Sequence, residues 1–436
     1  MFSNLTLKGW RQFSDVNIDF HPRLTIITGA NGSGKTTLLS LLSQCVGWNP
    51  AFVSSYRENE QGFLEYNNGL DATGGEDRRV INMSSPRHPS SISFGKLTYL
   101  RSYGGYAIEF FVQSSVWGGI YPIDLISDNQ RRDTNVVTYG YDVTAGVYIH
   151  SHRPIFPYRN LSTIPTSVET RGDIYRKYVD FRKKFIQSKI DRHHDTATLL
   201  IKQSLAALAI YGEGNSVVAP NRAAKQLFDG YVEILKKTLP PKLGFKKIKV
   251  AMPEVLLCTE TGDFPLDAIS GGISSIIDIT WQLYLLYEDE RPFVALIDEP
   301  ENHLHPEMQK SFMGNLIKAF PNVQFVIATH NPLMISSQKD SHVYVLDYDE
   351  NNKVRSTKLD YVNRAGTANA ILREVLGLDS SMPQWAEEEL RQIIEKYQSM
   401  EITGDALDAM RSELKEIGLE DYIPKTIADV IGGKTS

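Results

Sequence analysis

Cysteine is scarce in this sequence, with only Cys45 and Cys258 in 436 residues. Two cysteines cannot build the disulfide framework that small secreted domains use to support a limited core. Apolar runs are also short, and none reaches the roughly 20 residues that cross a bilayer. The opening stretch MFSNLTLKGWRQF lacks the apolar core of a signal peptide. These absences favour a cytoplasmic protein with no membrane association.

The charge is ordinary in amount but uneven in distribution. Charged residues make up 22% of the chain and hydrophobic residues 42%, as in a typical globular protein. Residues 171–249 hold 17 Lys and Arg against 7 Asp and Glu, whereas residues 379–436 hold 6 against 13. Such asymmetry is typical of regions that meet different partners, and equally of solvated helical faces.

The strongest motif is the stretch LTIITGANGSGKTTLLSLLSQ. Leu24–Thr28 is a short β-branched run that predicts a buried strand, and Thr37–Gln44 predicts a helix. Between them Gly29–Thr36 follows the phosphate-binding pattern G-x-x-x-x-G-K-T. The glycines let the backbone turn its N–H groups toward phosphate oxygens, and the helix N-terminus favours the bound anion. We therefore expect a nucleotide site formed by Asn31, Gly32, Ser33, Gly34, Lys35, Thr36 and Thr37.

A second apolar strand, PFVALID, ends in two adjacent carboxylates, Asp298 and Glu299. Adjacent carboxylates repel each other unless a cation lies nearby. In a P-loop protein that cation is Mg²⁺, which we expect Thr36 and Asp298 to hold while Lys35 reaches the terminal phosphates of ATP. Glu299 is then placed to polarise the water that attacks the γ-phosphate. The alternative, two surface acids at a strand end, is disfavoured by the P-loop in the same chain.

Two further motifs narrow the class. AISGGISS places Ser270, Gly271 and Gly272 at the start of an apolar helix, and NVQFVIATHNP is a buried strand that ends near His330. The order P-loop, Ser-Gly-Gly, Asp-Glu and strand-His resembles that of ABC-type ATPases. The wording of GANGSGKTTLL, LIDEPENHLHP and ATHNP resembles the RecF/SMC/OLD branch of soluble ATPases, among them antiphage-defence-type ATPases of the AAA family.

The resemblance covers residues 1–47 and 265–350 and implies an α/β fold. That fold is a P-loop NTPase head of the ABC type with a β-rich N-terminal lobe, an inserted helical arm and a C-terminal helical tail. The resemblance also implies that two copies pack head to tail. Each ATP then lies between the P-loop of one copy and the triplet Ser270, Gly271 and Gly272 of the other. His330 resembles the switch histidine that contacts the γ-phosphate, whereas Ile273 departs from the glutamine that often ends the signature.

Two of the nucleotide contacts that the resemblance implies have no clear residue in this sequence. The segment IHSHRPIFPYRNLSTIPT occupies the position of the Q-loop but contains no glutamine. His152 or Arg153 is the candidate substitute. The resemblance places the adenine contact in the first-strand segment, which points to Arg11 or Phe13.

Two pairs resemble metal-ligand patterns without completing one. His303 and His305 have an H-x-H spacing that zinc uses, but no Cys or acidic cluster accompanies them. The resemblance places them in the D-loop, a segment at the dimer interface. Asp347 and Asp349 form a D-x-D, but no strand-Glu-Gly element precedes it, so the pattern indicates an OLD-like protein without a Toprim nuclease.

The middle of the chain predicts a β-rich region and then a helical arm. Within residues 48–150, YAIEFFVQ and VVTYGYDVTAGVYIH alternate apolar and polar residues, which predicts antiparallel strands. From Asp173 to about Ile210 apolar positions recur at three and four, and a second helix is predicted from Ala223 to Leu239. Neither is long enough for a rod. The best cluster for contacting nucleic-acid phosphates, or an acidic protein partner, is Arg182, Lys183, Lys184 and Lys189.

These elements predict four segments. They are an N-terminal part of the head at 1–165, a basic helical arm at 166–250, a C-terminal part of the head at 251–360 and an acidic helical tail at 361–436. We expect a homodimeric or higher oligomeric ATPase that binds and hydrolyses Mg²⁺-ATP. Its expected setting is antiphage defence or DNA-end metabolism, beside a separate effector such as a nuclease and with DNA or RNA as a further partner.

Three alternatives to this function stay open at the level of sequence. One is a nucleotide-gated regulatory scaffold that sequesters a toxin or effector with little turnover. Another is the energising subunit of a membrane transporter, for which no coupling glutamine is visible. The third is a nuclease hidden in the helical regions.

Overall fold

A computed structural model shows how these predicted elements assemble. It describes the whole chain except residues 49, 51, 59–63, 68–69, 71–79, 82–90, 102–103, 114–119, 122, 128–143, 154–157, 187–195, 360–383, 399, 401–402, 420–421 and 433–436. The chain divides into two compact units, Met1–Ile371 and Leu372–Ser436. The boundaries of the four predicted segments stay a prediction.

The centre of the first unit is a group of parallel strands. Each residue of β3 (Leu24–Gly29), β16 (Phe293–Asp298) and β17 (Val323–Ala328) is buried, as expected for parallel strands that are covered on both faces. The spatial order is β18-β3-β17-β16-β12, with every neighbouring pair parallel. Strand β18 is His342–Tyr348 and β12 is Gly146–Ile149. The carboxyl ends of β3 and β16 therefore lie at the same edge of the sheet.

Beyond β18 the same sheet becomes mainly antiparallel. Its order continues β19-β2-β1-β8-β9-β11, in which only the β19–β2 pair is parallel. The aromatic rings of Trp10 and Phe94 stack with centroids 4.5 Å apart in the core beneath these strands. The predicted antiparallel lobe is thus present, and its strands are β1 (Phe2–Trp10), β2 (Phe13–Asp19), β8 (Ser91–Arg101), β9 (Gly104–Gln113), β11 (Ile123–Ser127) and β19 (Val354–Lys358), with β7 (Val80–Ile81) against β8.

The prediction is wrong for β12, which is not antiparallel. It pairs in parallel with β16, and Ile149 lies opposite Ile297. Val147, Tyr148 and Ile149 are all buried, so the run is a strand covered on both faces rather than an alternating one. Residues 136–143 of the same predicted stretch lie outside the described residues.

The remaining strands of the first unit form small sheets. β4 (Phe52–Val53) pairs with β10 (Ile120–Tyr121), and β5 (Ser55–Glu58) pairs with β6 (Leu64–Asn67). A three-stranded antiparallel sheet precedes the predicted signature and consists of β13 (Lys247–Ala251), β14 (Glu254–Cys258) and β15 (Asp263–Pro265).

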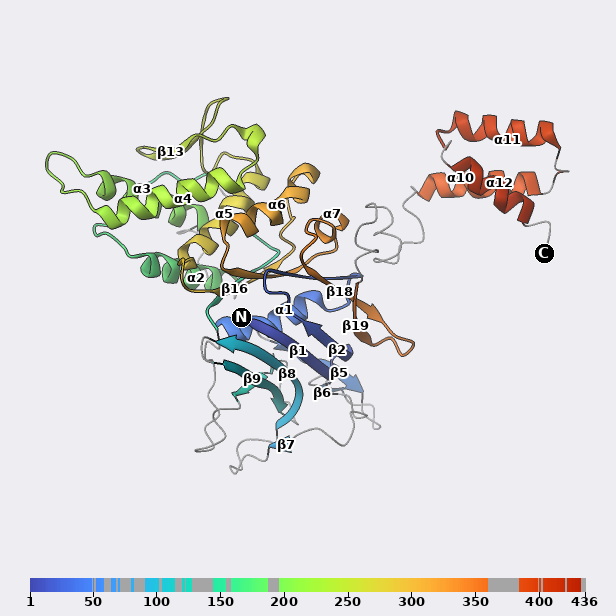
Figure 1. The fold of residues 1–436 in the computed structure, drawn as a ribbon, viewed down its shortest axis with the longest axis horizontal. Helices are drawn as coiled ribbons and strands as arrows, with labels where there is room; N and C mark the ends of the chain where they lie inside the picture. The colour runs from blue at the N-terminus through green and yellow to red at the C-terminus, as the bar shows by residue number, and fades with distance from the viewer. Residues whose placement is uncertain are drawn as a thin grey trace. The chain divides into compact units, whose positions relative to one another are not determined.

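Helices of the first unit gather beside β16, as Figure 1 shows for α2 to α6. The predicted helical stretch from Asp173 to Ile210 is two helices, since the hydroxyl of Thr196 accepts a hydrogen bond from the Leu199 N–H and begins a new helix. The predicted second helix is confirmed as α4. The helices are α1 (Lys35–Ser43), α2 (Arg171–Ile186), α3 (Ala197–Glu213), α4 (Arg222–Thr238), α5 (Gly271–Leu286), α6 (Pro306–Ala319) and α7 (Pro332–Ile335).

The second unit is a small helical bundle with a core of its own. Helices α10 (Gln384–Gln398), α11 (Gly404–Glu416) and α12 (Ile423–Gly432) bury Ala386, Ile393, Tyr397, Met410, Leu414, Leu419 and Val430. The predicted helix at residues 367–378 lies outside the described residues. In the part of the chain that the structure describes, every helix is too short or too polar to cross a membrane.

Candidate functional site

The P-loop connects β3 to α1, in the context that the motif requires. Gly34 caps α1 with a φ of 94°, and a Cβ at this position would lie 2.6 Å from the ring of Phe13. Both observations require glycine. Phe13 is fully buried under the loop, so its ring has no free face for adenine. The prediction for Phe13 is therefore wrong, because the β1–β2 hairpin places the ring in the core, whereas Arg11 stays a prediction.

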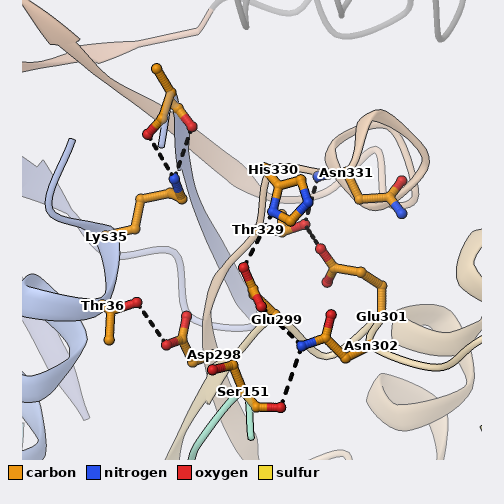
Figure 2. Close-up of polar contacts among 12 residues, drawn as sticks. Lys35, Thr36, Ser151, Asp298, Glu299, Glu301, Asn302, Thr329, His330 and Asn331 are labelled. Carbon is orange, nitrogen blue, oxygen red and sulfur yellow. Dashed lines mark hydrogen bonds and ion pairs between the residues drawn. The ribbon is translucent and has the colours of Figure 1, made fainter. Parts of the chain in front are cut away.

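Two side chains of the loop are already engaged. The Lys35 Nζ donates to the carbonyl oxygens of Gly29 and Ala30, each at 2.9 Å. The Thr36 hydroxyl donates to Asp298 Oδ2 at 2.8 Å, across 262 residues of sequence (Figure 2). The structure thus brings together the two residues predicted to hold Mg²⁺. Among the other predicted loop residues, Asn31 and Gly32 are exposed, Thr37 is half-buried and Ser33 is fully buried.

The environment of Asp298 fits a divalent cation. Its carboxyl is 2% exposed, and burial, together with the neighbouring Glu299, raises its pKa to about 6. In the P-loop, Ser33 Oγ is buried and has no hydrogen-bond partner among the described residues. The available ligands are one carboxylate and hydroxyl oxygens, a set that suits Mg²⁺ bound jointly with phosphates rather than zinc. The residues therefore fit Mg²⁺-nucleotide, although their role as ligands stays a prediction.

Glu299 and His330, the two predicted catalytic residues, face each other. The distance from Glu299 Oε1 to His330 Nδ1 is 3.3 Å, and the His330 side chain is 53% exposed. The other carboxylate oxygen, Oε2, accepts a hydrogen bond from Asn302 Nδ2 at 2.9 Å. Asn302 Nδ2 also donates to the Ser151 carbonyl at 3.3 Å (Figure 2). Glu299 is thus held on both oxygens, with part of its surface open to water.

Glu301 is a third carboxyl at this strand end that sequence reasoning missed. Its side chain accepts a hydrogen bond from the Thr329 hydroxyl, which in turn accepts one from the Asn331 N–H at 2.9 Å. Glu301 is 4% exposed, and burial raises its pKa. It therefore links the loop after β16 to the residues around His330. In the sequence, the signal for Glu301 is its place in the acidic run Asp-Glu-Pro-Glu at residues 298–301.

The Ser-Gly-Gly triplet begins α5, as predicted. Ser270 is the N-cap and its hydroxyl accepts from the Ile273 N–H at 3.5 Å. A Cβ on Gly272 would lie 2.8 Å from the carbonyl oxygen of His303, so glycine allows the D-loop to approach closely. His303 has a φ of 71°. Ser270 and Gly271 are exposed, and the nearest atoms to a Cβ on Gly271 belong to His303. The triplet is thus turned toward its own D-loop and solvent.

The predicted basic cluster on α2 is not an exposed surface. Arg182 is 1% exposed, because it lies on the face of α2 that packs against α5. Lys183 Nζ donates to the Gly47 carbonyl at 2.9 Å and lies 5.4 Å from the Trp48 ring centroid. Lys184 is exposed and Lys189 lies outside the described residues. The prediction is therefore wrong for Arg182, and Lys183 is only partly available.

Residues 24–336 match a protein family, AAA_21, whose description is "AAA domain, putative AbiEii toxin, Type IV TA system". The match spans most of the chain, and the chain belongs to this family. It is an ATPase head of the ABC type, from the branch that contains RecF, SMC and OLD proteins, as the motifs indicated.

Curated relatives resemble the chain over most of its length. The Retron Vc95 probable ATPase of Vibrio cholerae serotype O1 biovar El Tor is 22% identical over 464 residues, covering 96% of this chain and 87% of that protein. The Septu protein PtuA of Bacillus thuringiensis is 20% identical and covers 87% of this chain and 85% of its own. The OLD nuclease of Thermus scotoductus is 24% identical, with 81% and 63% covered. Among solved structures, an SMC head domain from Thermotoga maritima aligns with a TM-score of 0.44 and 14% identity over 82% of this chain and 99% of that one.

Proposed function

We propose that this protein is a dimerising ATPase that binds Mg²⁺-ATP at its P-loop and hydrolyses it with Glu299. The observation that carries the proposal is that the two adjacent carboxylates at the end of β16 have different partners. Asp298 accepts from Thr36 at 2.8 Å, whereas Glu299, one residue later, lies 3.3 Å from His330. Two adjacent carboxylates therefore have separate environments, one suited to a cation and the other to a water molecule.

Each residue of the site has one task in this proposal. Lys35 and the N–H groups at the start of α1 bind phosphate oxygens. When bound, Mg²⁺ supplies positive charge against the developing charge of the transferred phosphoryl group. Glu299 accepts a hydrogen bond from the attacking water and takes up its proton. His330 and Asn302 fix the direction of that carboxylate, and His330 is exposed enough to contact the γ-phosphate.

A second copy is proposed to complete the site. Ser270 and Gly271 are exposed at the start of α5, where free N–H groups favour an anion. Within the described residues, this triplet contacts its own helix and the D-loop. We therefore propose that Ser270, Gly271 and Gly272 meet the nucleotide of a neighbouring copy, in a homodimer or a higher homo-oligomer.

The relatives support a setting for this switch. Retron and Septu proteins are among them, and we propose a cytoplasmic role in antiphage defence beside a separate effector such as a nuclease. The alternative is a nucleotide-gated scaffold that sequesters the effector with little turnover. Two results would favour the scaffold: full binding of the effector when the protein assembles with a non-hydrolysable ATP analogue, and negligible ATP turnover.

The exposed part of the basic arm supports a nucleic-acid partner. Lys237, Lys246, Lys247 and Lys249 are exposed and have no ion pair within the described residues. Lys247 and Lys249 lie on the same face of β13, whereas Ile248 between them is buried. Uncompensated lysines that share a face can neutralise successive phosphates. We propose that these four lysines, rather than the cluster on α2, contact DNA or RNA.

Complementation between two inactive variants tests the dimer. Lys35→Ala removes the phosphate contact, and Ser270→Arg blocks the surface offered to the neighbour. Each variant alone should lose ATP turnover. An equimolar mixture should recover up to about a quarter of the wild-type rate, because half of the random dimers contain one site built from two intact halves. Turnover is measured as phosphate release.

The control is Ser412→Arg, since Ser412 is an exposed residue of α11 in the second unit. This variant should hydrolyse ATP at the wild-type rate. Full activity of Ser270→Arg alone, or no recovery in the mixture, would contradict the shared site. Glu299→Gln measured alongside should lower turnover by about 10²-fold or more while ATP still binds.

A further inference from the structure

Arg153 is a buried arginine that contacts the loop carrying Glu299. It follows β12 by four residues and is 8% exposed. Its Nη2 donates to the Glu299 carbonyl at 2.9 Å and lies 3.5 Å from each of the carbonyl oxygens of Pro300 and Asn302. One guanidinium therefore spans the backbone of the loop after β16.

That loop needs support because Glu299 has an unfavourable backbone. Its φ is 46°, in the left-handed region that residues with a Cβ rarely adopt. Such a conformation persists only where the surroundings fix it. The Glu299 N–H donates to the Ala328 carbonyl at 2.9 Å, and its own carbonyl accepts from the Asn302 N–H at 3.1 Å as well as from Arg153. The first two of these hydrogen bonds join backbone groups, whereas Arg153 contributes a side-chain donor.

The segment after β12 supports Glu299 a second time. The Ser151 carbonyl accepts from Asn302 Nδ2 at 3.3 Å, and the same amide donates to Glu299 Oε2 at 2.9 Å. Figure 2 shows Ser151, Asn302, Glu299 and His330 in one connected series. The segment thus fixes the backbone of Glu299 directly and its carboxylate through Asn302.

Arg153 is buried among charged side chains. Burial lowers the pKa of its guanidinium, Asp278 of α5 and the carboxylates of Glu301 and Asp298 raise it, and Arg182 of α2 lowers it. Asp278 and Arg182 are each 1% exposed.

We propose that Arg153 is a positioning residue for ATP hydrolysis. It fixes the left-handed backbone of Glu299, so that the carboxylate points at the attacking water. Arg153 acts through Glu299 and has no need to touch the nucleotide. The inference rests on the hydrolytic role proposed for Glu299.

The test compares Arg153→Lys and Arg153→Ala with wild type and with a matched arginine. Arg23 is the control, because its Nη2 also donates to two backbone carbonyls, Ile317 at 2.8 Å and Phe320 at 3.3 Å. For Arg153→Ala, kcat should fall about 10- to 100-fold while KM for ATP changes less than about threefold. Arg153→Lys should lie between Arg153→Ala and wild type. Millimolar guanidinium should restore part of the rate of Arg153→Ala, and Arg23→Ala should keep the wild-type kcat.

A loss specific to Glu299 gives two more results. The double variant Arg153→Ala with Glu299→Gln should be no slower than Glu299→Gln alone. The backbone N–H of Asn302, which donates to the Glu299 carbonyl, should exchange its hydrogen about tenfold faster in Arg153→Ala than in wild type. This exchange is measured without ATP.

The outcomes separate the two proposals. Wild-type kcat in Arg153→Ala, a loss confined to KM, or no rescue by guanidinium overturns the inference and leaves the proposed ATPase intact. Equal hydrolysis by wild type and Glu299→Gln overturns the proposed function instead. In that case hydrogen exchange at the Asn302 backbone N–H decides whether Arg153 fixes the loop. Unchanged exchange in Arg153→Ala would overturn that role.

Discussion

Asp298 and Glu299 are adjacent in sequence but lie in different environments. Asp298 ends the buried strand β16 and is 2% exposed, whereas the Glu299 side chain is 30% exposed. The positive φ of Glu299 breaks the extended backbone at this point, and its carboxylate meets His330 and Asn302. One backbone angle therefore separates a carboxyl suited to a cation from one suited to water.

The raised pKa of Asp298 predicts a trade between stability and nucleotide binding. The folded pKa of about 6 exceeds the ordinary value of 3.8. The folded protein thus binds this proton more tightly than the unfolded chain does. The contribution to stability is full below about pH 4 and is lost as the pH rises through 6. At pH 7.5 the ionised carboxylate then opposes folding by about 3 kcal/mol.

Asp298→Asn should therefore raise the stability of the nucleotide-free protein at pH 7.5 by about 2 kcal/mol. It should also flatten the dependence of Tm on pH from about 4 to 7.5, most of which falls between pH 4 and 6, and abolish the rise in Tm that Mg²⁺-ATP gives to wild type. Thermal unfolding across this pH range measures all three. Asp340→Asn is the control, since its carboxyl is 89% exposed and its effect should be small. An unchanged pH dependence in Asp298→Asn would show that burial of this carboxyl has no such effect.

At the scale of elements, the sequence predicts what is local. The P-loop lies between its own strand and helix, and the apolar run of β16 ends at Asp298. Both the P-loop and Asp298 could therefore be predicted without knowledge of the fold. Arg153 and Glu299 lie 146 residues apart and meet only because β12 pairs with β16. A four-residue strand gives too weak a pattern to predict that pairing.

Arg182 shows a different limit. It lies four residues after Tyr178 and eight after Ile174, both buried, and so on the apolar stripe of α2. The helical period carried that information, but the residue type suggested a surface. The prediction followed the charge of Arg182, but its position on the helix determines whether it packs against α5.

The helix α3 is tied to the predicted signature by a buried ion pair. Lys202 Nζ lies 2.7 Å from Glu254 Oε2 on β14 and 3.0 Å from Asp267 Oδ2, with its own side chain fully buried. Asp267 precedes Ser270 by three residues. Lys202 therefore links α3 to the segment that leads into α5.

Lys202→Met should destabilise the first unit by about 3 to 5 kcal/mol, because two carboxylates lose the buried cation that they share. Adding Asp267→Asn should return part of that loss. The control is Lys225→Met on α4, whose exposed ion pair with Glu213 should contribute less than about 1 kcal/mol. Denaturant unfolding measures the series, and equal losses from Lys202→Met and Lys225→Met would contradict a buried ionic link.

At the scale of the whole molecule, the sequence predicts where charge is enriched and the structure shows which charges are available. In the basic stretch, Lys236 pairs with Glu233 at 2.7 Å, and Lys242 pairs with Glu307 at 2.8 Å. Lys202 and Arg182 are buried. A net charge over a segment therefore overestimates the surface that a polyanion meets, and the exposed lysines near β13 are part of what remains for it.

Replacing Lys237, Lys246, Lys247 and Lys249 with Gln should weaken binding to nucleic acid in a salt-dependent way. If each lysine contacts one phosphate, the slope of log Kobs against log salt should become shallower by about 3 to 4. Fluorescence anisotropy with a 30-nucleotide single strand and the matching duplex, titrated in KCl from about 50 to 200 mM, measures this slope. The control replaces four exposed lysines elsewhere, Lys184, Lys310, Lys318 and Lys358, and should keep the wild-type slope. A slope that changes equally in both sets would indicate non-specific attraction, and no binding by wild type would assign this surface to an acidic protein partner instead.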